Sequence, residues 1–238
     1  MRILGIDGSG LVASVALVED DNLIGEYTTG YKKTHSQTLL PMLDELGKMI
    51  DLDLYSIDAI AVAAGPGSFT GLRIASATAK GLGFTLGTPI VSVSTVDALA
   101  YNMWGNPGLI CPIMDARRGQ VYTGLYKFEN DGAFTVVKDQ CAVSFEEIAA
   151  DINSRGEMVT FLGDGVPVFG DKIKSFLTVP YRLAPAHLNR QHASSVAALG
   201  LIYYLNGDCQ PAADHRPEYL RLSQAERERM EKEKEGRA

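Results

Sequence analysis

Short apolar runs and glycine turns alternate along the first hundred residues, and their order constrains the fold more than any other feature of the sequence. Three strands joined by glycine and acidic turns are predicted first, over residues 2–7, 13–19 and 23–29. They are followed by a helix over 35–50, a strand over 58–64, a second helix, a strand over 89–94 and a short helix over 95–102. The run DAIAVAA is continuously apolar after its first residue, which is typical of a strand covered on both faces. This order predicts a mixed sheet with helices.

The second half of the chain repeats part of this order. The predicted elements are strands over 109–115, 120–128 and 134–143, a helix over 144–154, a strand over 158–165 and an apolar helix over 192–207. Ser144 followed by Glu147 is a capping-box pattern at the start of the first of these helices. The repetition predicts a duplicated α/β architecture with an N-terminal lobe, 1–100, and a smaller C-terminal lobe, 101–238. The tail over 225–238 is almost all charged and predicts a solvated helix.

Composition excludes some classes of protein. The 238 residues carry a formal charge of −7, which argues against a protein that grips nucleic acid by itself. Cys111, Cys141 and Cys209 are widely spaced and predict no disulfide framework. The sequence shows neither a signal segment nor an apolar run of the roughly 20 residues that span a bilayer. A cytoplasmic protein without membrane contact is therefore predicted.

The turn Asp7-Gly8-Ser9-Gly10 between the first two strands has two interpretations. An acidic residue and glycines at such a corner can hold a metal and a phosphate in phosphotransferases. A plain hairpin turn also uses Asp and Gly, because both tolerate positive φ. The sequence leaves both open and favours the plain turn, so that Asp7 and Ser9 are at most the remains of a nucleotide site.

The stretch AGPGSFTGLR, over 64–73, joins a strand to a helix in the layout of a phosphate loop. It lacks the lysine of a P-loop, and Pro66 removes one of the backbone N–H donors that an anion cradle needs. The four histidines form no i, i+4 pair, and no GxSxG motif is present. The sequence therefore predicts no catalytic residue, no bound metal and no cofactor.

Small residues recur every four positions along the helix that follows this loop. Gly71, Ala75, Ala79 and Gly83 form one ridge, which lets another element approach closely at a cost of about 1 kcal/mol for each helical glycine. The close neighbour is either the protein's own sheet or first helix, or a helix of another chain. The wide apolar stripe of the first helix favours a second covered surface. The predicted partner interface comprises Leu39, Leu43, Leu46, Gly71, Ala75, Ala79, Leu82 and Gly83.

Four stretches of the chain resemble the TsaB (YeaZ) family of bacterial proteins required for threonylcarbamoyladenosine in tRNA. They are ILGIDGS with ASVAL, HSQTLLPML, AGPGSFTGLRIASATAKGL and PEYLR. The likeness is close over the first hundred residues and looser afterwards. One departure is the first turn, where the family usually has Asp-Thr-Ser and this chain has Asp7-Gly8-Ser9. The resemblance implies a shortened two-lobed actin-like ATPase fold, of the ASKHA and ribonuclease H-like type.

The resemblance also implies a role and partners. TsaB-like proteins are non-catalytic subunits that pair with the catalytic TsaD, stabilise it and help the ATPase TsaE to dock, and they meet tRNA only through that complex. The metal-binding histidines of TsaD align with Thr95 and Leu99, which cannot replace them. An apolar pairing surface also predicts a weak homodimer of the isolated chain. The alternative is an active phosphotransferase or ATPase, for which the corner at Asp115–Gly119 is an incomplete second phosphate turn.

Overall fold

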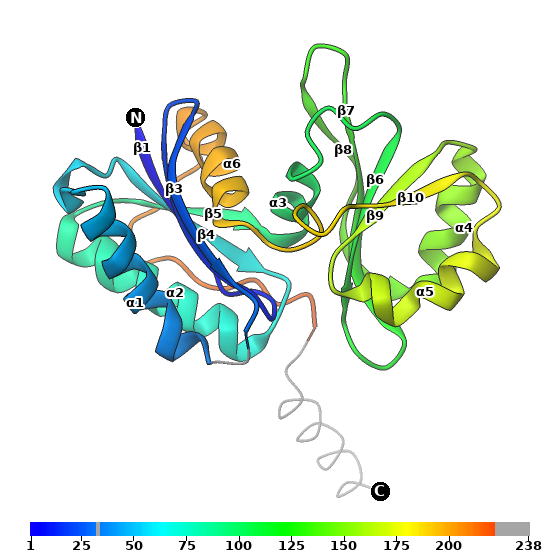
Figure 1. The fold of residues 1–238 in the computed structure, drawn as a ribbon, viewed down its shortest axis with the longest axis horizontal. Coiled ribbons are helices and arrows are strands. Elements are labelled where there is room, and N and C mark those ends of the chain that lie inside the picture. Colours follow the sequence, from blue (N-terminus) through cyan, green and yellow to red (C-terminus); the bar gives the residue numbers. More distant parts are fainter. Residues whose placement is uncertain (32–33, 222–238) are drawn as a thin grey trace, which may run out of the picture.

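The computed structural model describes residues 1–31 and 34–221 as two lobes, each built on a five-stranded mixed sheet (Figure 1). The elements drawn from the first part of the chain are β1 (Arg2–Asp7), β2 (Ala13–Glu19), β3 (Asn22–Thr29), α1 (His35–Met49), η1 (Leu54–Ser56), β4 (Ala59–Gly65), α2 (Phe69–Leu86), β5 (Ile90–Ser94) and α3 (Thr95–Tyr101). The predicted order of three strands, helix, strand, helix, strand and helix is confirmed.

The first sheet has the strand order β3-β2-β1-β4-β5. Its β1, β2 and β3 are antiparallel neighbours, with Ile3 opposite Val18, so the predicted meander is confirmed. β4 pairs with β1 and β5 pairs with β4, both in parallel. α1 leads from β3 to β4, and α2 leads from β4 to β5. β4 is buried along its whole length, as a continuously apolar strand covered on both faces must be.

The second sheet repeats this topology in the order β10-β9-β6-β7-β8. Its elements are β6 (Leu109–Asp115), β7 (Gln120–Phe128), β8 (Phe134–Ser144), α4 (Phe145–Arg155), β9 (Val159–Leu162), α5 (Gly165–Phe176) and β10 (Tyr181–Leu183). The Ser144 hydroxyl caps α4 by accepting from the Glu147 N–H at 3.2 Å, as the capping box predicts. The duplication is confirmed, although α5 and β10 were not predicted from the sequence.

The helices cover both faces of the first sheet. α1 and α2 lie together on one face, and α6 (Ala193–Leu205) packs across β1, β2 and β4 on the other (Figure 1). α3 lies between the lobes, against β6 and β7 of the second sheet and against α6. The assignment of 101–238 to a second lobe is therefore corrected, because α6 and the segment after it belong to the first lobe. The predicted tail helix at 225–238 lies outside the described residues.

Each lobe has its own apolar core. Leu4, Ile6, Ile60 and Val62 point toward α1 and α2 in the first lobe, where all four are fully buried. In the second lobe, Phe145, Phe161 and Phe169 are the largest members of a cluster between the sheet and the helices α4 and α5. Within the two described stretches, no helix combines the length and the apolarity that crossing a membrane requires.

Candidate functional site

The small ridge of α2 faces the interior of the first lobe. Ala75 and Ala79 have no exposed surface and belong to the core beneath α1, while Gly71 and Gly83 are buried at the two ends of the ridge. Ser68 begins the helix as its N-cap, with its hydroxyl 3.3 Å from the Gly71 nitrogen, whose N–H donates to it. The sequence left two possible neighbours for this ridge. In the structure, the ridge packs against the protein's own core.

The two glycines of the ridge are explained inside the monomer. A Cβ at Gly71 would collide with the carbonyl oxygen of Gly8, and a Cβ at Gly83 would lie 2.8 Å from the Thr88 carbonyl oxygen and 2.9 Å from the Ala212 Cβ. The cost of helical glycine is therefore offset by the close approach of the protein's own backbone. No second chain is required to account for either residue.

The predicted contact residues of α1 are also core residues. Leu39, Leu43 and Leu46 are 1%, 6% and 2% exposed, and Leu82 of α2 is half-buried against the same cluster. The assignment of these side chains and of the α2 ridge to a partner interface is therefore corrected. These buried side chains stabilise the lobe, and they fix which sides of α1 and α2 face the solvent.

The outward faces of α1 and α2 carry a different set of residues. Leu40, Met49 and Phe84 are 54%, 69% and 82% exposed, and Ala77 and Gly81 are exposed between the ends of α2. We call the four residues that share one side of α2 the outer face: Arg73, Ala77, Gly81 and Phe84. Leu40 and Met49 lie on opposite sides of α1, because nine helical residues correspond to about two and a half turns. A Cβ built at Gly81 meets nothing within 4 Å, so the monomer offers no steric reason for this glycine.

The sequence contained a signal for the outer face that was missed. Arg73, Ala77 and Gly81 are spaced by four residues, like the buried ridge, but they lie on the opposite side of the helix. The exposed Ala77 and Gly81 make the middle of α2 as open to close approach as its buried side. A large exposed aromatic beside such a strip is typical of a protein–protein contact.

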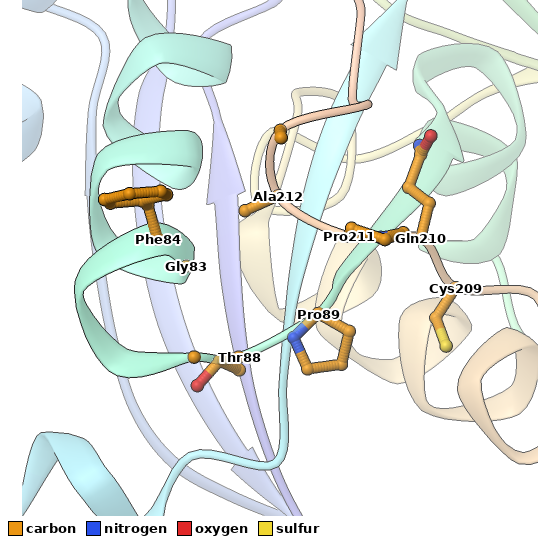
Figure 2. A pocket seen from close by; sticks show the side chains of 10 residues that line it. Gly83, Phe84, Thr88, Pro89, Cys209, Gln210, Pro211 and Ala212 are labelled. Atoms are coloured by element: carbon orange, nitrogen blue, oxygen red, sulfur yellow. The ribbon is translucent and has the colours of Figure 1, made fainter.

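A pocket of about 480 Å³ adjoins the end of the outer face (Figure 2). Its walls come from the last turn of α2, the turn between α2 and β5, and the segment after α6. The lining residues include Phe84, Thr88, Pro89, Cys209, Pro211 and Ala212. The Phe84 side chain is largely exposed and borders the pocket from α2 (Figure 2). The pocket is lined mainly by apolar side chains and small residues, and it extends the apolar surface of α2.

The Asp7–Gly10 turn makes hydrogen bonds within itself and to the loop at Ser68, while the Asp7 Oδ2 is buried without a hydrogen-bond partner among the described residues. The Asp7 Oδ1 accepts from the Ser9 N–H at 2.8 Å and from the Ser9 hydroxyl at 2.6 Å, and the Ser68 N–H donates to the Ser9 carbonyl at 2.7 Å. A Cβ at Gly67 would collide with the same carbonyl, so the two loops are in direct contact. Burial raises the pKa of the Asp7 carboxyl above its ordinary value, against the hydrogen bonds from Ser9. This geometry favours the plain turn over a phosphate cradle.

A cleft of about 540 Å³ separates the two lobes at the ends of β1, β4 and β6. Arg117 and Arg118, in the turn after β6, have φ values of 64° and 56°, a left-handed conformation that is uncommon for arginine. The Arg117 guanidinium pairs with the Asp115 carboxylate at 3.1 Å, and the Arg117 backbone N–H donates to the same carboxylate at 2.8 Å. Asp164 on the cleft wall adds a further carboxyl, so the charges of the cleft are mixed.

The structure also places the two positions aligned with metal-binding histidines. Thr95 is fully buried at the start of α3, and Leu99 is 1% exposed in the core between α3 and the second sheet. Within residues 1–31 and 34–221, no three or more His, Cys, Asp or Glu side chains gather as a metal site would require. These residues do not fit a TsaD-like metal.

The chain is similar to known proteins over nearly its whole length. A family model described as "TsaD: tRNA N6-adenosine threonylcarbamoyltransferase" matches residues 22–228. The tRNA threonylcarbamoyladenosine biosynthesis protein TsaB of Bacillus subtilis is 37% identical over 98% of this chain and 100% of its own length. TsaB of Escherichia coli is 35% identical over 56% of this chain and 58% of its own. The structure of YeaZ from Pseudomonas aeruginosa superposes with a TM-score of 0.79 at 27% identity, covering 92% and 99% of the two chains.

Two mixed sheets of one topology, with helices and a cleft between the lobes, define a shortened actin-like fold of the ASKHA class. Within that class the GPGSFTGLR loop, the buried α2 ridge and the full-length relatives identify the family. The chain belongs to the TsaB (YeaZ) family and thus to the biosynthesis of threonylcarbamoyladenosine in tRNA.

Proposed function

We propose that this chain is a non-catalytic subunit of the tRNA threonylcarbamoyladenosine complex that pairs with a TsaD-like protein through the outer face of α2 together with exposed residues of α1. The observation that carries the proposal is the strip of Ala77 and Gly81, which is exposed and has open space above Gly81. Glycine in the interior of an exposed helix costs about 1 kcal/mol relative to alanine. A helix of a partner packed closely on this strip would offset that cost.

The rest of the outer face supports the same partner. Phe84 offers a large apolar surface beside the strip, and Leu40 and Met49 are exposed on α1, which packs against α2. A contact of two helices with two helices buries such side chains at its centre, where truncation usually weakens binding most. Arg73, at the N-terminal end of the strip, adds a charged group for the polar rim of the contact.

The non-catalytic role rests on what the site residues do. Asp7 and Ser9 are engaged with each other and with the loop at Ser68, and Thr95 and Leu99 offer no metal ligand. The chain therefore binds no cofactor in this proposal, and catalysis belongs to the TsaD-like partner. A TsaE-like ATPase would dock on the assembled pair, and tRNA would be met only through the complex.

The same face gives a weak homodimer when the partner is absent. An unpaired apolar face associates with a second copy of itself through a symmetric contact. Self-association and partner binding then compete for Phe84 and the strip beside it. Sedimentation velocity over a range of concentrations measures the homodimer, and added TsaD should dissociate it into heterodimers.

A pair of matched variants tests the proposal. Ala77→Arg places a long charged side chain on the outer face, and Ala150→Arg makes the same change on an exposed position of α4 in the other lobe. We expect both chains to stay folded by circular dichroism. Only Ala77→Arg should lose co-elution with the TsaD of the same source in size-exclusion chromatography. Equal binding by both variants would reject the outer face as the contact.

A further inference from the structure

Residues 209–221 follow α6 as a segment without helix that contains one turn at 212–214, and we call it the C-terminal strap. It runs past α2 and ends between the lobes (Figure 1). Its first part is fixed to the first lobe, because Gln210 pairs with Ile90 at the start of β5. The Lys80 Nζ of α2 also donates to the carbonyl oxygens of Ala213 at 2.9 Å and His215 at 3.0 Å.

The strap then reaches the end of β4. The Glu218 N–H donates to the Ala64 carbonyl oxygen at 2.7 Å. Gly65, which follows, has φ +129°, and a Cβ there would collide with the Glu218 carbonyl oxygen. The strap therefore lies directly on the GPGS loop, and Gly65 is the residue that permits this close approach.

Side chains on α2 hold the next residue of the strap. The Tyr219 ring lies 4.9 Å from the Phe69 ring, centre to centre. The Arg73 guanidinium is 3.9 Å from the centre of the Phe69 ring, and its Nε donates to the Tyr219 hydroxyl at 3.2 Å. These aromatic and cation–π contacts tie Tyr219 to the first turn of α2.

The end of the strap is bonded to the second lobe. An Arg221 guanidinium nitrogen donates to the Ala116 carbonyl oxygen at 2.6 Å, in the turn after β6. The Gln140 amide nitrogen of β8 donates to the Glu218 carboxylate at 3.4 Å. Residues 218–221 are thus held by both lobes at once. The first lobe holds them through the Ala64 carbonyl and α2, and the second lobe through two side-chain hydrogen bonds.

This bridge lies at the cleft. The carboxyl ends of parallel strands are where open α/β sheets bind ligands, and here Glu218, Tyr219, Leu220 and Arg221 form part of the cleft wall. We propose that residues 218–221 act as a latch that fastens the two lobes across this cleft. Breaking the bonds to the second lobe opens the cleft while the first part of the strap stays in place.

The strap is anchored in the first lobe just before the latch begins. His215 is 1% exposed, and its Nδ1 lies 2.9 Å from the Ser92 hydroxyl, so the strap is anchored in the first lobe at this point. Glu218 and Tyr219 are exposed beyond it. The strap therefore pivots after His215, and the lobes separate by a hinge motion about the connections near α3 and α6.

Hydrogen exchange and small-angle X-ray scattering on the full chain test the latch. Arg221→Ala removes the bond to Ala116, and Arg216→Ala is the control, because Arg216 is an exposed arginine of the same strap. In Arg221→Ala, amide exchange over 218–221 and 115–119 should rise by about tenfold or more, since bonds made by charged groups are among the stronger ones. The radius of gyration should increase, while exchange in β1 and β4 should stay as in Arg216→Ala.

Two results would overturn the proposal. One is equal exchange and equal scattering for Arg221→Ala and Arg216→Ala, which would make the Arg221 contact irrelevant to lobe closure. The other is amide exchange that rises together in the strands of the sheets and in the strap. This would have to occur in both Arg221→Ala and a second test variant, Tyr219→Ala. The strap would then be an inseparable part of the core. Local opening in Tyr219→Ala supports the latch even where Arg221→Ala lowers global stability.

Discussion

Gly81 and Gly83 lie two residues apart in α2 and face opposite environments. At Gly83 a Cβ would lie 2.8 Å from the Thr88 carbonyl oxygen and 2.9 Å from the Ala212 Cβ, whereas at Gly81 it would meet nothing within 4 Å. One glycine is explained by the fold of the monomer and the other is not. The two positions therefore separate what α2 does for stability from what it is proposed to do for a partner.

Alanine at these two positions should change stability in opposite directions. Gly83→Ala should lower the free energy of unfolding by about 1–3 kcal/mol, because Thr88 or Ala212 must move. Gly81→Ala should raise it by up to about 1 kcal/mol, because the exposed helix loses a glycine without a clash. Urea denaturation of both variants measures the difference. A stabilised Gly83→Ala would contradict the packing described here.

Arginine at neighbouring alanines should separate core from surface. Ala79 has no exposed surface, so Ala79→Arg overpacks the core, buries an unpaired charge and should cost several kcal/mol. Ala77 is exposed, so Ala77→Arg should change the free energy of unfolding by less than about 0.5 kcal/mol. Thermal melting followed by circular dichroism checks both. A well-folded Ala79→Arg chain would refute the placement of this helix.

His192 should stabilise the fold in its charged form. Its Nδ1 lies 3.2 Å from a Glu26 carboxylate oxygen and its Nε2 lies 2.9 Å from the His187 carbonyl oxygen, so both nitrogens face acceptors. The Glu26 hydrogen bond raises the pKa of His192 above its ordinary 6.5, against the opposing effect of burial, and the nearby Asp7 acts in the same direction as Glu26.

The pKa of His192 is higher in the folded than in the unfolded chain, and this sets the sign of the pH dependence of stability. The stabilisation is fully present below 6.5 and is lost as pH rises through the raised pKa. Between pH 6 and about pH 8.5, wild type should therefore lose more unfolding free energy than His192→Asn, which has no titrating group. Parallel pH dependences in the two chains would show that the pair contributes nothing.

His215 should act in the opposite direction. Burial lowers its pKa to about 4, and the Lys80 ammonium, which donates to the His215 carbonyl oxygen, adds to the effect. Ser92 and Gln210 are the polar neighbours of its Nδ1. The strap is therefore held by a neutral imidazole.

Acid should then loosen the strap. A histidine whose folded-state pKa is depressed contributes stability above 6.5, and this is lost as pH falls from 6.5 toward 4. Hydrogen exchange over 209–221 should rise in this window in wild type, after correction for intrinsic rates. His215→Gln should show a flatter profile. A wild-type profile identical to that of the variant would exclude His215 as the titrating group.

The sequence predicted the topology of the first lobe well and the environment of its helices less well. The strands up to β5 follow from continuous apolar runs and glycine turns, which report local structure directly. The ridge of Ala75 and Ala79 was visible in the sequence, but small residues permit close packing against the same chain as well as against another. Only the structure shows that this ridge is buried and that Ala77 and Gly81 are exposed.

The second lobe was harder to predict for identifiable reasons. α5 contains Gly165, Pro167 and Gly170, which have low helix propensity, and its formation depends on packing of Phe169 and Ile173 into the core. β10 has only three residues, all of them exposed, and shows no periodicity. The return of α6 to the first sheet is a long-range contact that no local pattern encodes.

The affinity of Gly81→Ala for TsaD tests the proposed pairing most directly. Isothermal titration of wild type and Gly81→Ala with the TsaD of the same source gives the two dissociation constants, and urea denaturation of the same samples gives stability. The outer face predicts a Gly81→Ala chain that is at least as stable as wild type and binds TsaD at least about tenfold more weakly, because the added methyl group pushes the helices apart. Misfolding cannot produce that combination. Undiminished affinity in Gly81→Ala would contradict close helix packing at this position.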